Sequence, residues 1–191
     1  MAQGKTAIGD RIIVCGGNCA GKSTLGRNLA QKLGCNFMDI ENYYFPETGT
    51  DYIYAGARTK EEVSDLLLED MKRYHNSILA SVKGDYGGEV EAMFTCAVLV
   101  SVPKAVRLKR VKDRSFQKFG DRVLLNGDLY EKEKRFLDMV ERRSGQETED
   151  WLQSVNIPII YVDGENSIAY NTEKIVRFLH DRQLDISLPV G

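Results

Sequence analysis

Residues 16–23 read Gly16-Gly17-Asn18-Cys19-Ala20-Gly21-Lys22-Ser23, which is the spacing G-x-x-x-x-G-K-[ST]. An apolar run, 11–15, precedes this stretch and has the composition of a buried strand. The segment that follows, 23–33, places leucines four residues apart and stops at Gly34, as an amphipathic helix does. A strand, a glycine-rich loop and a helix in this order indicate a phosphate-binding loop, because backbone N–H groups and the helix N-terminus together surround a polyphosphate.

The residues of this loop have different expected tasks. Lys22 should reach the β- and γ-phosphates of a nucleotide, and the Ser23 hydroxyl should bind Mg²⁺. The other nucleotide-binding candidates lie along the loop or at the helix start: Gly16, Gly17, Asn18, Cys19, Ala20, Gly21 and Thr24. Cys19 is either a filler position or a redox-sensitive thiol, since reactive cysteines often lie at helix N-termini.

The composition excludes several classes of protein. The 191 residues are 42% hydrophobic and 28% charged, which is ordinary for one globular domain. The 26 Lys+Arg against 28 Asp+Glu give a net charge of −2, so we expect neither a nucleic acid polymer nor a membrane as partner. The four cysteines match no zinc spacing, and we expect a cytoplasmic protein with reduced thiols. The oligomeric state is left open.

Apolar runs alternate with helical periodicities along the chain, which predicts a three-layer α/β/α fold around a parallel sheet. The expected strands are 11–15, 36–39, 77–82, 96–102 and 157–162. Helices are expected after a capping box at Thr59, with Pro103 as a first helical residue, from Asp128, and through Ile175 near the end. The predicted organisation is a flexible lead-in, one domain and a tail: 1–10, 11–182 and 183–191.

Two connections do not fit the regular alternation of strands and helices. Segment 41–58 is rich in aromatic residues, and segment 115–127 is polar and basic. Long connections in a compact domain are usually lids or binding loops, and those at the carboxyl ends of parallel strands face the ligand. We therefore expect 41–58 to be an acceptor-binding segment and 115–127 a lid.

Along roughly residues 11–180 the sequence resembles the adenylate, shikimate and gluconate kinases, a group of small phosphate-loop kinases. The phosphate loop is one match. Asp39-Ile40-Glu41 is similar to the D-x-D/E of shikimate and gluconate kinases, and Arg110-Val111-Lys112-Asp113-Arg114 to the lid-base R-x-x-x-R of adenylate kinases. Tyr161-Val162-Asp163-Gly164 looks like their adenine-side loop. The resemblance implies a five-stranded parallel sheet of order 2-3-1-4-5 and Mg-ATP as the phosphate donor.

Asp39 and the two arginines are the expected partners of Lys22 in catalysis and nucleotide binding. A carboxylate at the end of a strand beside the loop can orient an acceptor hydroxyl or hold Mg²⁺, so Asp39 and Glu41 are candidates for the acceptor site and Asp39 also for Mg²⁺. The alternative is that these residues only cap a helix or form a turn. The resemblance puts Arg110 against the adenine and Arg114 on the phosphates. The alternative is a solvated basic helix, because Arg107, Lys109 and Lys112 lie on it too. Arg122 is a weaker candidate, and surface positions are expected for Lys118, Arg135, Arg142 and Arg143.

The acceptor site is the least determined part of the sequence. Arg58 precedes the Thr59 cap, where these kinases often place an acceptor-binding arginine, and Lys83 lies in a segment that faintly resembles the S-x-L-K of gluconate kinases. The tyrosines of 43–54 either line the acceptor pocket or pack in a lid. The adenylate-kinase D-G-F-P-R and the shikimate-kinase glycine triplet are missing, so neither activity is assigned.

The sequence thus predicts an enzyme, an ATP-dependent phosphotransferase acting on a small metabolite or nucleotide. The alternative is an ATP-binding regulatory or switch protein with little transfer. A GTPase is disfavoured because no Asn-Lys-x-Asp guanine signature occurs in the chain.

Overall fold

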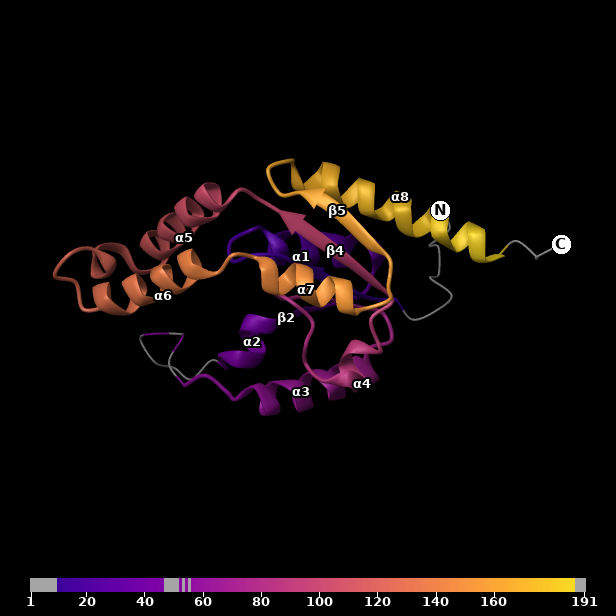
Figure 1. The fold of residues 1–191 in the computed structure, drawn as a ribbon, viewed down its shortest axis with the longest axis horizontal. Coiled ribbons are helices and arrows are strands. Elements are labelled where there is room, and N and C mark those ends of the chain that lie inside the picture. Colours follow the sequence, from indigo (N-terminus) through magenta and orange to yellow (C-terminus); the bar gives the residue numbers. More distant parts are fainter. Residues whose placement is uncertain (1–9, 47–51, 53, 55, 188–191) are drawn as a thin grey trace.

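The computed structural model describes residues 10–46, 52, 54 and 56–187. In this part of the chain, five parallel strands form one sheet in the order β2-β3-β1-β4-β5, with helices on both faces (Figure 1). The strands are β1 Arg11–Cys15, β2 Asn36–Asp39, β3 Ser77–Ala80, β4 Cys96–Ser101 and β5 Ile159–Asp163. The predicted architecture and strand order are confirmed.

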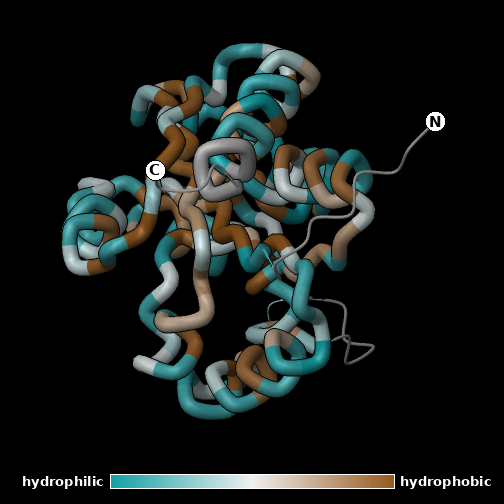
Figure 2. Tube along the Cα trace, turned by 90° about the vertical axis from the view of Figure 1, so that its right-hand side faces the viewer, coloured by the Kyte–Doolittle hydropathy of each residue, from teal (hydrophilic) through white to brown (hydrophobic). Residues whose placement is uncertain are grey.

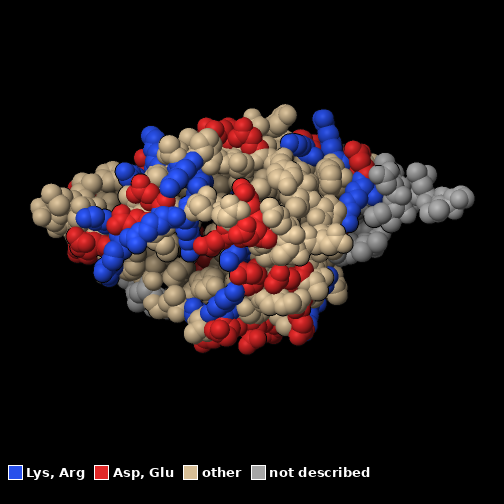
Figure 3. Space-filling view, in the orientation of Figure 1, with Lys and Arg blue, Asp and Glu red and all other residues tan. Residues whose placement is uncertain are grey.

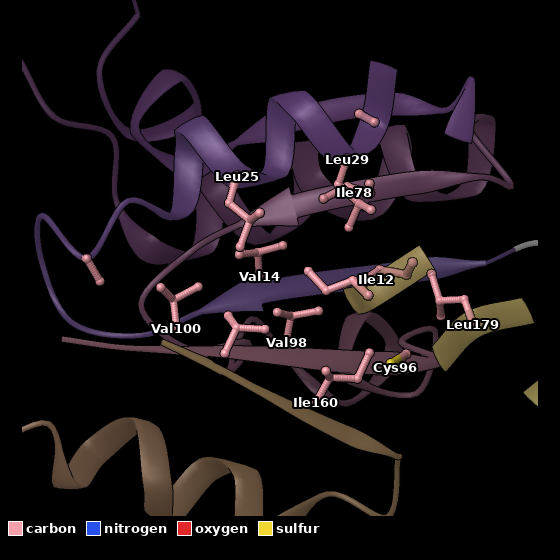
Figure 4. Packing of buried hydrophobic residues seen from close by; sticks show 14 of the residues in the cluster. Ile12, Val14, Leu25, Leu29, Ile78, Cys96, Val98, Val100, Ile160 and Leu179 are labelled. Atoms are coloured by element: carbon pink, nitrogen blue, oxygen red, sulfur yellow. The ribbon is translucent and has the colours of Figure 1, made fainter. Parts of the chain in front are cut away.

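The sheet is buried because its central strands are apolar on both faces. Ile13 of β1 lies in register with Leu79 of β3 and Ala97 of β4. Side chains from one face pack under helices α1 (Lys22–Leu33) and α8 (Ile168–Ser187); Figure 4 shows Val14, Leu25 and Leu179 in this layer. Parallel strands need such cover on both sides, because each strand buries both faces.

The second layer consists of α3 (Lys60–Arg73), α4 (Gly88–Glu91) and α7 (Gln146–Ser154). Val63 and Leu67 of α3 are fully buried there, and Trp151 of α7 packs edge-on against Phe94. The ring of Trp151 also lies under Gly84, where a Cβ would come within 2.9 Å of Trp151 Cη2. Figure 2 shows the resulting distribution, with hydrophobic residues gathered inside and hydrophilic ones on the outer turns of the helices.

Two helices form a hairpin at one end of the molecule. These are α5 (Lys104–Phe119) and α6 (Tyr130–Arg142), joined through the 3₁₀ turn η1 (Gly120–Val123) and drawn on the left in Figure 1. Figure 3 shows basic and acidic side chains gathered together over that end. The predicted lid segment 115–127 therefore contains the last turn of α5 as well as the connection, which begins at Gly120.

Several local expectations differ from the structure. The predicted tail 183–191 is wrong over 183–187, because α8 continues to Ser187 and the chain has no Gly or Pro between 168 and 188 to stop it. The rest of that tail, 188–191, lies outside the described residues. Pro103 is the N-cap of α5 rather than its first helical residue. Three helices were not expected, α2 (Ile40–Tyr44), α4 and α7. Residues 1–9 of the lead-in, and 47–51, 53 and 55 of the acceptor segment, lie outside the described residues.

Candidate functional site

The phosphate loop connects the end of β1 to the start of α1. Gly16 has φ +138, and a Cβ on it would lie 2.5 Å from the carbonyl oxygen of Val100 in β4, so only glycine fits between the two strands. The backbone N–H of Gly16 donates to the Val82 carbonyl (3.2 Å), and Cys19 adopts the left-handed region with φ 56. The loop is thus fixed by close backbone contacts at the carboxyl ends of β1, β3 and β4.

Lys22, the first residue of α1, folds back over the loop. Its Nζ donates to the Gly17 carbonyl at 2.8 Å. Burial lowers the pKa of Lys22 to about 8, although nearby negative charge, that of Glu41 above all, opposes the shift. A buried amine beside two carboxylate-bearing residues, Asp39 and Glu41, is the electrostatic centre of the site.

Asp39 ends β2 and is also the N-cap of α2. Its Oδ1 accepts from the N–H of Glu41 at 3.2 Å. The structure therefore shows Asp39 in the helix-cap role that was the alternative to a role in catalysis. It does not exclude a role in transfer, because the cap uses one carboxylate oxygen.

Glu41 and Arg114 join the acceptor segment to the hairpin. The guanidinium of Arg114 binds the Glu41 carboxylate through both terminal nitrogens, Nη2 to Oε2 at 2.7 Å and Nη1 to Oε1 at 3.4 Å. Arg114 Nη2 also donates to the Tyr54 hydroxyl at 3.3 Å. The arginine predicted to hold phosphate is thus paired with the carboxylate predicted to hold the acceptor.

Arg110 lies one turn before Arg114 on α5, and its guanidinium contacts the loop that follows β5. Its Nη2 donates to the Gly164 carbonyl at 3.3 Å. A Cβ on Gly164 would lie 2.8 Å from the Ala20 carbonyl oxygen, so this loop packs directly on the phosphate loop. The neighbouring Asp163 carbonyl accepts from Asn171 of α8 at 2.7 Å.

The two cations predicted for the acceptor site have partners within the protein. Arg58 Nη1 donates to the Tyr43 carbonyl at 2.8 Å. Lys83 Nζ pairs with Asp85 at 3.1 Å and with Glu147 at 3.8 Å. No partner is common to Arg58 and Lys83 in the described residues, so a single acceptor pocket lined by both stays a prediction.

Two arginines that were not assigned to the nucleotide site contact the phosphate loop: Arg143 was expected on the surface, and Arg107 was named only in the alternative of a solvated basic helix. Arg143 follows α6, and its Nη1 donates to Asn18 Oδ1 at 3.3 Å. Arg107 is 8% exposed, and its guanidinium lies against Gly17. A signal for Arg107 was available, because 107, 110 and 114 recur at i, i+3 and i+7 and so share a helix face. Arg143 gave no such signal, since 125 positions separate it from Asn18.

The aromatic residues of the acceptor segment pack against the hairpin. Tyr52 and Tyr54 surround Phe119, with ring centroids at 5.6 and 6.5 Å. The Tyr52 hydroxyl donates to Glu133 Oε1 (2.9 Å), and Ser115 donates to the other oxygen of Glu133 (2.7 Å). The lid packing of the tyrosines is one of the two alternatives that the sequence left open, whereas the buried carboxylate of Glu133 was not assigned.

The donor set at the loop fits a nucleotide-borne Mg²⁺. Mg²⁺ in phosphate-transfer sites takes one or two protein oxygens plus phosphates and waters, rather than a full protein cage. Ser23 at the start of α1 and Asp39 at the end of β2 offer a hydroxyl and a carboxylate near Lys22. Within the described residues, no group of three or more His, Cys, Asp or Glu forms a metal cage.

Comparison with known proteins defines the class. A family model described as an AAA domain matches residues 12–138, and the chain belongs to that family. Its fold is that of the small shikimate- and gluconate-kinase-like proteins. Shikimate kinase from Acinetobacter baumannii in complex with shikimate aligns with a TM-score of 0.57 and 19% identity, covering 92% of this chain and 95% of that one. A gluconokinase from Sinorhizobium meliloti 1021 aligns with a TM-score of 0.55 and 13% identity, covering 96% and 99%.

A curated relative matches in sequence over most of its length. The uncharacterized protein YqaC of Bacillus subtilis (strain 168) is 27% identical over 176 residues, which is 88% of this chain and 96% of YqaC. None of the described helices is both long enough and apolar enough to cross a membrane.

Proposed function

We propose that the protein transfers the γ-phosphate of Mg-ATP to a small metabolite or nucleotide. The observation that carries this proposal is the partly buried Lys22, which donates to the Gly17 carbonyl of a phosphate loop within electrostatic reach of Asp39 and Glu41. Phosphoryl transfer needs positioning and charge neutralisation more than covalent chemistry, and this cluster supplies both signs of charge. The shikimate- and gluconate-kinase-like fold supports the assignment.

The residues divide into a donor side and an acceptor side in this proposal. The phosphate loop, Lys22 and Ser23 hold the triphosphate with its Mg²⁺, and Arg110 lies beside the loop where the base would bind. Arg114 exchanges its Glu41 partner for phosphate oxygens, because a guanidinium binds either anion through the same two nitrogens. Asp39 orients the acceptor hydroxyl.

A panel of acceptors incubated with Mg-ATP tests the proposal. ADP release above the ATPase background is expected for at least one sugar, sugar acid, hydroxylated carboxylic acid or nucleoside monophosphate. The matched control is Lys22→Ala, which should abolish the acceptor-dependent rate while its thermal unfolding stays close to that of the parent. ATP binding without any acceptor-dependent release would instead favour a regulatory ATP-binding protein. Full activity in Lys22→Ala would remove the phosphate-loop assignment.

A further inference from the structure

Arg107 is a buried arginine that lies against the phosphate loop. It sits in the first turn of α5 and is 8% exposed. Its Nε donates to the Val102 carbonyl at 3.2 Å. If Gly17 carried a Cβ, that atom would lie 2.7 Å from Arg107 Cζ and 3.0 Å from its Nε. The guanidinium therefore lies across the Cα of Gly17, the second residue of the loop.

This cation has no anionic partner in the described part of the chain. The ion pairs found there do not include Arg107, whereas Arg114 on the same helix pairs with Glu41. Its Val102 hydrogen bond uses one of the five N–H donors of a guanidinium. Burying a charge without a counterion is unfavourable, so an anion that binds beside Arg107 would relieve this cost.

Three cationic side chains from different elements meet at Gly17 and Asn18. Lys22 of α1 donates to the Gly17 carbonyl, Arg143 donates to the Asn18 side chain, and Arg107 packs on Gly17. Two of these cations are held by neutral oxygens of the loop itself, and no carboxylate neutralises Arg107. The charge that this arrangement complements is a compact polyanion.

We propose that Arg107 is a nucleotide-binding residue whose guanidinium provides fixed positive charge, next to Gly17, for the polyphosphate of a bound nucleoside triphosphate. The inference rests on the proposed nucleotide site but does not depend on transfer. The alternative is that Arg107 has a purely structural role, connecting α5 to the loop. In a purely structural role Arg107 would stabilise the ligand-free protein, whereas a buried cation without a counterion stabilises only the complex with the nucleotide.

Arg107→Met separates the two roles, because methionine keeps the length and the apolar stem and removes the charge. Binding of Mg-ATP and of inorganic tripolyphosphate is measured by calorimetry, and the melting temperature is measured without ligand. We expect both ligands to bind at least tenfold more weakly to Arg107→Met, adenosine binding to be unchanged, and the ligand-free melting temperature not to fall. Lys112→Met, which removes an exposed charge from the same helix, should bind both ligands as the parent does.

The outcomes distinguish this inference from the proposed function. If the parent binds tripolyphosphate but transfers phosphate to no acceptor, the proposed function fails and Arg107 is still tested. Parent-like tripolyphosphate binding by Arg107→Met overturns the inference. A lower ligand-free melting temperature of Arg107→Met, or its failure to fold, also overturns the inference unless Arg107→Lys shows otherwise. Arg107→Lys restores the charge without the geometry of the guanidinium. If it recovers at least part of the tripolyphosphate affinity, the inference stands.

Gly17→Ala tests the geometry independently. Gly17 does not have a positive φ, and the atoms nearest to an added methyl group are those of the Arg107 guanidinium. We expect Gly17→Ala to lower the ligand-free melting temperature in the parent and to have a much smaller effect in the Arg107→Ala background, where the space is free. Equal effects in the two backgrounds would show that Arg107 does not lie on Gly17, and the inference would be overturned.

Discussion

The ammonium group of Lys22 donates to the backbone carbonyl of Gly17 in the phosphate loop, and it is poorly hydrated there. Burial brings its pKa from 10.5 to about 8, so the free protein loses this charge between about pH 7 and pH 9. Bound phosphate favours the ammonium form and restores the higher pKa. The affinity for a polyphosphate is therefore linked to the uptake of a proton at Lys22.

We predict that the affinity for Mg-ATP falls as the pH rises through about 8, by up to about tenfold per pH unit above that value. Calorimetry at pH 8.5, in two buffers that differ in ionisation enthalpy, should show proton uptake on binding. Lys22→Arg is the control, because its guanidinium stays charged and its profile should be flat over the same range. Equal affinity of the parent at pH 7 and pH 9 would contradict the prediction.

Asp39 caps α2 and is proposed to act on the acceptor, and a pair of substitutions can separate the two roles. Asparagine caps a helix about as well as aspartate, so Asp39→Asn should keep the start of α2 while removing the charge. We predict a loss of about 10²-fold or more in kcat with a KM for ATP within a few-fold of the parent, because the carboxylate acts on the acceptor. Asp39→Ala should in addition lose about 1 kcal/mol of stability. An unchanged kcat in Asp39→Asn, measured with an identified acceptor, would leave Asp39 as a cap only.

At the scale of elements, the hairpin of α5 and α6 is joined to the acceptor segment by both charge and packing. The Arg114–Glu41 pair is about half exposed on each side, so it contributes little to stability, of the order of 1 kcal/mol or less. Glu133 is different, since it is buried and accepts from both Tyr52 and Ser115. Because Glu133 contacts both Ser115 of the hairpin and Tyr52, a movement of the hairpin should displace Tyr52 as well.

We predict that Glu133→Ala releases the hairpin locally. Two hydroxyl groups lose their acceptor, which costs about 1–3 kcal/mol, and backbone hydrogen exchange across 104–142 should become faster. Glu131→Ala is a matched control: Glu131 lies in the same first turn of α6 but is exposed, so it removes the same favourable helix-end charge without the buried contacts. Similar exchange in the two variants would mean that Glu133 does not hold the hairpin.

At the scale of the molecule, the features that could be predicted from the sequence are those that short stretches of the chain determine. The phosphate loop, the strand order and the capping box of α3 each depend on residues close together in the chain or on a known pattern. The short helices α2 and α4 were missed because four or five residues give no period, and tertiary contacts decide their form. Arg143 on Asn18 was missed because only the folded chain brings 18 and 143 together. Asp39 and Glu41 were placed at the right strand end, but their pairing with Arg114 required the position of the hairpin.

Trp151 gives the molecule its own optical probe. It is the chain's one tryptophan, its ring lies under Gly84, and its indole N–H donates to Glu91 at 3.1 Å. Gly84 stands between Lys83 and Asp85, in the segment expected to meet the acceptor. We predict that a true acceptor shifts or quenches the intrinsic emission in a saturable titration, that Mg-ATP alone changes it much less, and that Trp151→Phe abolishes the signal. An acceptor that is turned over without any change in emission would place its binding site away from Lys83. Unlabelled compounds can therefore be screened by fluorescence before any product is assayed.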